Sequence, residues 1–230
     1  MEFIEVAGEW LPAFLSGAWL TVQLVAISAL LGLILAVPLA LALAARTLAL
    51  RALAYGYSLF FRGTPLLVQI FLIYYGVGQF AWIRASVLWT VLRDPYVCAL
   101  IAFTLNTAAY SGELLRGGIC AVPRGEIEAA RAIGMRRALA YRLVILPRAF
   151  RIVLPAYSNE LVMLLKASSL ASTITLLDLM GVTRLAVAKT YASVEFFVLA
   201  GLVYYAMAAA ISYGLAQIEK RANRYAAVAR

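Results

Sequence analysis

The chain has 230 residues, of which 65% are hydrophobic and 13% charged; its formal net charge is +9 and its mean hydropathy is +0.91. So few charged residues cannot coat a soluble globule of this length, because soluble domains carry about 25%. The composition therefore excludes a soluble enzyme or binding module and predicts a chain that lies in a lipid bilayer.

Five low-charge stretches follow one another along the chain, and a spanning helix needs about 20 mostly apolar residues. They cover residues 18–45, 63–83, 95–112, 152–182 and 196–218. We predict an all-α membrane protein with one transmembrane helix in each stretch. Only the fourth carries charges, namely Glu160, Lys166 and Asp178, and charges within a span usually serve function.

The charges between these stretches predict the orientation, because Lys and Arg are retained on the cytoplasmic side. The acidic leader with Glu2, Glu5 and Glu9 is predicted to lie outside, whereas residues 116–151, with eight arginines, lie inside. The other connections fit an outer amino terminus and an inner carboxyl terminus: Arg46, Arg51 and Arg62 inside; Arg84, Arg93 and Asp94 outside; Arg184, Lys189 and Glu195 outside; Lys220, Arg221, Arg224 and Arg230 inside. This bias explains the net charge, so we expect contact with lipid and no nucleic-acid partner.

Several chemistries are absent from the sequence. There is no histidine, and none of the three lysines follows a glycine, so the chain lacks a Gly-Lys-Ser/Thr phosphate loop. Cys98 and Cys120 would lie about 33 Å apart along one helix, too far for a disulfide. We predict a non-catalytic chain without a metal site that does not itself hydrolyse ATP.

Residues 62–65, Arg-Gly-Thr-Pro, have the pattern of a helix start. Thr64 is suited to cap free backbone N–H groups, and Pro65 is suited to the first helical position. A purely structural role is sufficient for these residues.

The basic connection predicts a short helix, a turn and a second helix. Pro123 precedes the acidic Glu126 and Glu128, and basic Arg131 follows, an order that matches the helix dipole. Gly134 is suited to a left-handed turn. The alternative is an amphipathic segment that lies on lipid headgroups.

The spacing in this connection resembles the coupling loop of importer permeases of the ATP-binding-cassette class. That pattern is Glu-Ala-Ala, three residues, Gly, nine residues and Ile-x-Leu-Pro; the chain has Glu128-Ala129-Ala130, Gly134 and Leu146-Pro147, with Val144 at the Ile position. Further strings resemble polar amino acid permeases, closest to those for histidine, for arginine, lysine and ornithine, and for octopine: residues 62–69, 105–110, 154–160 and 166–170.

The resemblance implies a single permease domain over residues 1–230, the transmembrane domain of a type I importer in the bacterial cytoplasmic (inner) membrane. It implies two cytoplasmic ATPase subunits that bind ATP and magnesium, a second permease that is identical or related, and a periplasmic or surface-tethered solute-binding protein. The coupling loop would cover about residues 117–150. The residues implied in ATPase coupling are Glu126, Glu128, Ala129, Ala130, Arg131, Gly134 and Met135.

The candidate solute-binding residues are polar groups expected to face the interior of the helix bundle. Asn106, Tyr110 and Glu113 share one face of the third predicted helix. The full set is Asn106, Thr107, Tyr110, Glu113, Glu160, Lys166 and Ser168. Our hypothesis is that Glu160, Asn106 and Thr107 accept hydrogen bonds from the ammonium and polar side chain of an amino acid.

Structural pairing is the alternative for several of these residues. Lys166 could neutralise Glu160, Glu113 or Asp178, and Glu113 could pair with Arg116 one helical turn away. Asp178 could simply lie at the outer boundary of its span. The hydroxyls that begin at Ser168 could serve close helix packing as well as a pore.

Two other functional classes are weighed against an ATP-driven amino acid permease. A self-sufficient secondary transporter or channel would normally have more spans and internal repeats, and a membrane enzyme would need a catalytic cluster at one interface. The sequence shows neither feature. It leaves open which amino acid or opine is carried and whether the second permease is identical.

Overall fold

The computed structural model describes residues 2–223 and the side chains of residues 8–221. The predicted outer carboxylates Glu2 and Glu5 and the tail arginines Arg224 and Arg230 lie outside the described side chains. Within the described part of the chain all regular structure is helical, as the sequence predicts.

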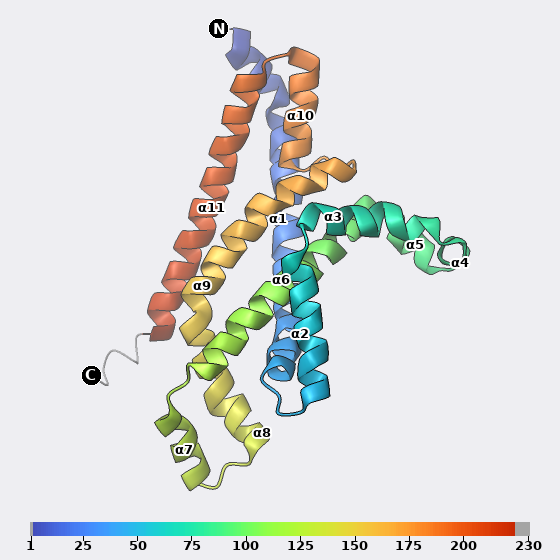
Figure 1. Ribbon diagram of the computed structural model, residues 1–230. Helices are drawn as coiled ribbons and strands as arrows, with labels where there is room; N and C mark the ends of the chain where they lie inside the picture. Colours follow the sequence, from blue (N-terminus) through green and yellow to red (C-terminus); the bar gives the residue numbers. More distant parts are fainter. Residues whose placement is uncertain (1, 224–230) are drawn as a thin grey trace.

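Two long helices run most of the length of the molecule, α1 (Glu2–Leu43) and α11 (Ser193–Asn223) (Figure 1). Helices α6 (Pro95–Cys120) and α9 (Leu146–Ala167) lie between them at an angle. Leu24 of α1, Phe103 of α6 and Leu165 of α9 meet in the central core. Helices α1, α6 and α11 cover the first, third and fifth predicted spans, apart from the last two residues of the first, whereas α9 covers only the first half of the fourth.

The second predicted span is wrong as a single straight helix. Helix α2 (Leu48–Gly63) ends before Thr64, and α3 (Leu66–Phe71) continues through a π-helical turn (Leu72–Gly76) and a 3₁₀ turn (Val77–Gln79), at 103° to α2. Arg62 therefore lies at a bend between two helices and not in the connection after the first span. The sequence count missed α2 because its arginines interrupt the apolar run.

The predicted helix start at residues 62–65 is confirmed in place, since α3 begins at Leu66, but its capping differs. Thr64 caps no N–H with its side chain; its Oγ1 donates to the carbonyl of Phe60 at 2.7 Å and accepts from Gln69 Nε2 at 2.8 Å. Pro65 precedes the first helical residue. The Thr64 hydroxyl therefore secures the end of α2 to α3.

The outer connection predicted around Arg84, Arg93 and Asp94 contains two short helices, α4 (Ala81–Arg84) and α5 (Leu88–Leu92). They project to one side of the bundle (Figure 1). Asp94 then caps α6 by accepting a hydrogen bond from the Tyr96 N–H at 2.8 Å, which explains why α6 begins at this point.

The fourth predicted span is also broken. Helix α9 passes into a 3₁₀ segment (Ser168–Ile174), and α10 (Leu179–Thr190) follows at a bend of 52°. Thr175 has a left-handed φ of 71° at this break. Glu160 and Asp178 therefore do not share one continuous helix. The break was hidden because residues 167–177 carry no charge.

Asp178 does not lie at an exposed boundary, because its exposed fraction is 0%. Its carboxylate caps α10 by accepting a hydrogen bond from the Gly181 N–H at 3.0 Å. The neighbouring Leu179 N–H donates to Thr21 Oγ1 of α1 at 3.1 Å. Asp178 thus fixes the start of α10 against α1.

Three helices in the described residues are long and apolar enough to cross a membrane, and the number rises to five if each bent pair counts as one span. Cys98 and Cys120 are free and lie near opposite ends of α6, which confirms the absence of a disulfide between them.

At one end of the molecule the α6–α9 connection forms α7 (Arg124–Ala132), α8 (Arg137–Ala140) and a π-helical turn (Tyr141–Ile145) (Figure 1).

Two adjacent glycines test the packing of α6 on α9. A Cβ on Gly118 would lie 2.6 Å from Val153 Cγ1 and 2.9 Å from the Ala149 carbonyl oxygen, whereas a Cβ on Gly117 meets nothing within 4 Å. Gly118→Ala is expected to destabilise the chain by about 1–3 kcal/mol through overpacking. Gly117→Ala should leave stability unchanged or raise it by about 0.5–1 kcal/mol. Thermal denaturation of the two variants in detergent measures the difference, and equal midpoints would contradict the packing.

Candidate functional site

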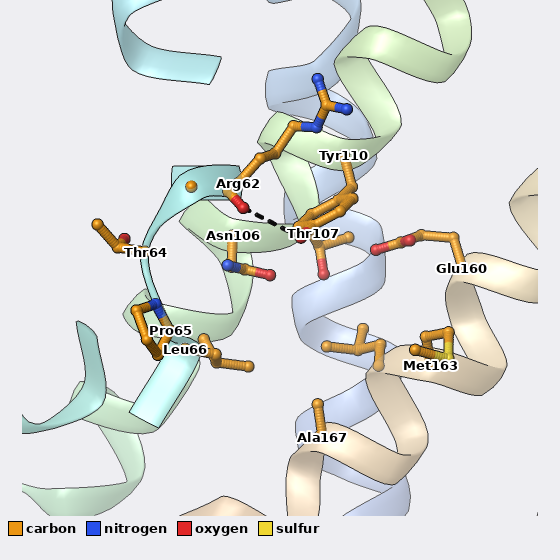
Figure 2. A pocket seen from close by; sticks show the side chains of 12 residues that line it. Arg62, Thr64, Pro65, Leu66, Asn106, Thr107, Tyr110, Glu160, Met163 and Ala167 are labelled. Atoms are coloured by element: carbon orange, nitrogen blue, oxygen red, sulfur yellow. Dashed lines mark hydrogen bonds between the residues drawn. The ribbon is translucent and has the colours of Figure 1, made fainter. Parts of the chain in front are cut away.

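A polar cavity of about 430 Å³, which we call the main cavity because it holds most of the predicted solute-binding residues, lies where the α2–α3 bend faces α6 and α9. The α2–α3 bend, α6 and α9 contribute side chains to it (Figure 2). Its lining residues are Arg62, Gly63, Thr64, Pro65, Leu66, Asn106, Thr107, Tyr110, Glu160, Met163, Leu164 and Ala167. Four predicted solute-binding residues, Asn106, Thr107, Tyr110 and Glu160, are therefore brought together.

Asn106 holds the bend between α2 and α3. Its Nδ2 donates to the carbonyl of Phe61 at 3.0 Å and to Gln69 Oε1 at 3.1 Å. Gln69 Nε2 in turn donates to the same Phe61 carbonyl at 2.9 Å and to the Thr64 carbonyl at 3.1 Å. These bonds satisfy the carbonyl groups that the broken helix leaves free. Because both amide donors are used, the Asn106 side-chain oxygen remains as an acceptor, and it points into the cavity (Figure 2).

Thr107 and Glu160 supply the remaining polar groups on the cavity wall. Thr107 has an exposed fraction of only 1%, and its Oγ1 has no hydrogen-bond partner among the described residues. The Glu160 carboxylate points from α9 towards the cavity and has no ion pair within 4.0 Å among the described side chains (Figure 2). A half-buried carboxylate and a buried hydroxyl without partners make a site suited to a hydrogen-bonding cation.

Arg62 forms the rim of the cavity, a position that the sequence assigned to a cytoplasmic connection. Its guanidinium lies 5.5 Å from the ring centroid of Tyr110, and the Tyr110 hydroxyl donates to the Arg62 carbonyl at 3.5 Å. Arg62 Nη1 lies 3.6 Å from Glu113 Oε1. The resemblance of residues 62–69 to polar amino acid permeases was the one sequence signal for a role of Arg62. The apolar runs do not predict the bend that places Arg62 at the cavity.

Glu113 does not line this cavity. Its carboxylate pairs with Arg116 at 2.6 Å, as the structural alternative predicted, and accepts a hydrogen bond from Ser58 Oγ at 3.3 Å. It faces a neighbouring cavity of about 390 Å³ with Arg51 and Arg116. Glu113 is therefore neutralised by its own arginine neighbours, and Glu160 remains as the carboxylate of the main cavity, which Arg62 also lines.

Lys166 and Ser168 lie outside the lining of the main cavity. Lys166 is exposed and forms no ion pair with Glu160, Glu113 or Asp178 within 4.0 Å. Ser168 is buried, and its hydroxyl donates to the Leu165 carbonyl at 2.7 Å. Their roles in solute binding stay predictions; Met163 and Ala167 are lining residues that the sequence did not single out.

The predicted helix, turn and second helix of the basic connection are confirmed. Gly134 has φ +77°, and the Gly134 and Met135 N–H groups donate to the carbonyls of Arg131 at 2.9 Å and Ala130 at 3.1 Å. This is the Schellman pattern that ends a helix at a left-handed residue. The turn therefore depends on a glycine at position 134.

This helical connection is attached firmly to the ends of α6 and α9. Ile127 of α7 packs on the cluster of buried side chains that includes Ile119, Ile145 and Ala149, and Glu126 Oε1 lies 3.2 Å from Arg148 Nε. Ala130 is buried, whereas Glu128, Ala129 and Arg131 are exposed. The connection thus has one face anchored on the helix bundle and one free face that is accessible to a partner protein.

The chain belongs to the family described as the inner membrane component of binding-protein-dependent transport systems, whose model matches residues 29–224. The resemblance to importer permeases is thereby confirmed. The chain is 50% identical over 195 residues to the octopine transport system permease protein OccM of Rhizobium meliloti, covering 85% of this chain and 80% of that protein. It is 44% identical over 168 residues to the arginine ABC transporter permease protein ArtM of Escherichia coli K12, covering 73% and 75%.

A solved structure supports the same fold. The chain matches a crystal structure of an amino acid ABC transporter with histidines at a TM-score of 0.82 and 32% identity, with 94% of this chain and 96% of that chain covered. The architecture is therefore that of the transmembrane subunit of an ABC importer.

Proposed function

We propose that the chain carries polar, basic amino acids or opines across the bacterial cytoplasmic membrane as the permease subunit of an ATP-driven importer. The single observation that carries the proposal is the cavity in which the unpaired Glu160 faces Thr107 and Asn106. A carboxylate with two neutral acceptors suits an ammonium or guanidinium group. The names of the octopine and arginine relatives support the same solute class.

In this proposal the five spans have an outer amino terminus and an inner carboxyl terminus, which places α7 and α8 in the cytoplasm. Two ATPase subunits bind ATP and magnesium and dock on the free face of this connection, in contact with Glu128, Ala129 and Arg131. A second permease completes the solute path, and a solute-binding protein delivers the solute from outside. Closure of the ATPases moves α6 and α9 through the anchored face at Ile127, which alternately opens the cavity to each side.

Uptake by the reconstituted assembly tests this function. Proteoliposomes that contain the chain with its second permease and ATPase, supplied with binding protein, should accumulate radiolabelled arginine only when ATP is enclosed. Unlabelled lysine, ornithine, histidine, octopine and a neutral polar amino acid compete in parallel to rank the solutes. Accumulation by this chain alone without ATP would instead indicate a secondary transporter or channel.

A further inference from the structure

Another polar cavity, of about 450 Å³, lies at the end of the molecule that carries α7 and α8. Arg46, from the turn between α1 and α2, meets Arg131 of α7 and Arg137 of α8 in its wall. We call it the arginine cavity. A smaller cavity of about 370 Å³ shares Arg46, Arg137 and Tyr141 with it, so the basic surface continues along the α1–α2 turn.

The three arginines converge without a protein counter-charge. None of them forms an ion pair within 4.0 Å in the described part of the chain, and the nearby Glu126 is already paired with Arg148. Guanidinium groups stay charged at any physiological pH, and three like charges around one space repel one another. An anion in the cavity would remove this repulsion.

The shape and position of the cavity indicate which anion fits. Guanidinium groups bind phosphate oxygens in pairs of parallel hydrogen bonds. Apolar Ile127, Met135 and Ile145 line the cavity beside the arginines, so the ligand has both charged and apolar parts. Arg46 directly follows the long apolar helix α1, and Arg137 begins the segment that returns into the helix bundle. The cavity thus lies where membrane-crossing helices end.

We propose that the arginine cavity binds the phosphate-bearing headgroup of an anionic phospholipid from the cytoplasmic leaflet. The leaflet assignment rests on the orientation given under the proposed function. Basic pockets between helices on the cytoplasmic side are suited to such headgroups, and each arginine near an anionic surface contributes attraction. A bound headgroup bridges the α1–α2 turn to α7 and α8. It therefore restricts movement of the α7–α8 connection relative to the membrane-spanning helices.

Native mass spectrometry of the purified full-length chain tests the site with short-chain lipids. Dioctanoyl phosphatidylglycerol should bind the wild type, and dioctanoyl phosphatidylcholine and inorganic phosphate should bind far more weakly. The double variant Arg46→Gln, Arg137→Gln should weaken phosphatidylglycerol binding by about 25-fold, at about fivefold for each arginine. Neither Arg46 nor Arg137 belongs to the set of residues assigned to ATPase coupling, whereas Arg131 does and is therefore left unchanged in these variants.

The matched control is Arg136→Gln, Arg142→Gln, which removes the same charge from exposed arginines of the same connection that do not line the cavity. It should bind phosphatidylglycerol as the wild type does. Arg46→Lys, Arg137→Lys keeps the charge and serves if the Gln variant fails to fold; it should lose the paired hydrogen bonds and weaken binding while still preferring the anionic lipid.

Three results would overturn the proposal. Equal weakening by the lining variant and its control would show a diffuse surface charge. Phosphate binding as strong as lipid binding would show a site for free anions. Normal lipid binding by the lining variant, together with loss of ATPase association, would assign the arginines to protein carboxylates. Because lipid binding is measured without solute or ATP, a failure of arginine uptake leaves this test intact.

Discussion

Glu160→Gln is expected to lower the uptake of a cationic amino acid by about 10- to 100-fold in the ratio of maximal rate to KM. The substitution keeps the shape of the side chain and removes the only carboxylate that lines the main cavity, a group with no ion pair within 4.0 Å among the described side chains. A charge-assisted hydrogen bond contributes about 1.5–3 kcal/mol, and each 1.4 kcal/mol corresponds to a factor of ten. Initial uptake rates in proteoliposomes over a range of arginine concentrations give the ratio.

Met163→Leu is the matched control, because Met163 lines the same cavity and the exchange conserves volume and polarity. It should retain uptake within about twofold, as expected for a volume-conserving apolar exchange. Uptake of a neutral polar amino acid by Glu160→Gln separates charge recognition from a general defect, since that solute should lose much less. Unchanged arginine uptake by Glu160→Gln would refute the role given to this carboxylate.

The helix content and the approximate positions of most spans were predictable because apolar runs report burial in the bilayer directly. The breaks were not. In the α2–α3 pair, Arg62 interrupts the apolar pattern, yet its charge is tolerated because Glu113 lies 3.6 Å away on another helix. Near Thr175 the opposite happens: residues 167–177 carry no charge although Thr175 has a left-handed φ, so the charge pattern cannot reveal the break. Both features depend on contacts between distant residues.

The same distinction applies to the cavity. The helical period correctly placed Asn106 and Tyr110 on one face, and both line the cavity with Glu160. The helical period could not show that Glu113 lies outside the main cavity. The α2–α3 bend determines which part of this face of α6 lines the cavity. The neutralisation of Glu113 by Arg116 was predictable as an alternative, since both lie on one helix at a spacing of three residues.

Gly134→Ala is expected to lower both the copurification of the ATPase subunit and solute-stimulated ATP hydrolysis severalfold. A Cβ at this position meets nothing within 4 Å, so the cost comes from the backbone alone, whose φ is +77°. A left-handed conformation costs a residue other than glycine about 1–2 kcal/mol. The Schellman turn then loosens, and Glu128 is no longer presented in one orientation. The ratio of ATPase to permease after affinity purification, and phosphate release with loaded binding protein, measure the effect.

Gly125→Ala is the internal control for this loop. Its Cβ also meets nothing within 4 Å, but Gly125 lies inside α7 without a left-handed φ, so the exchange should leave coupling intact. Glu128→Lys tests the docking face itself, because it reverses an exposed charge and leaves the turn unchanged. We expect it to reduce ATPase association without lowering the thermal stability of the permease. If Gly134→Ala and Glu128→Lys both assemble with the ATPase and transport at full rate, the loop does not couple the ATPase to α6 and α9.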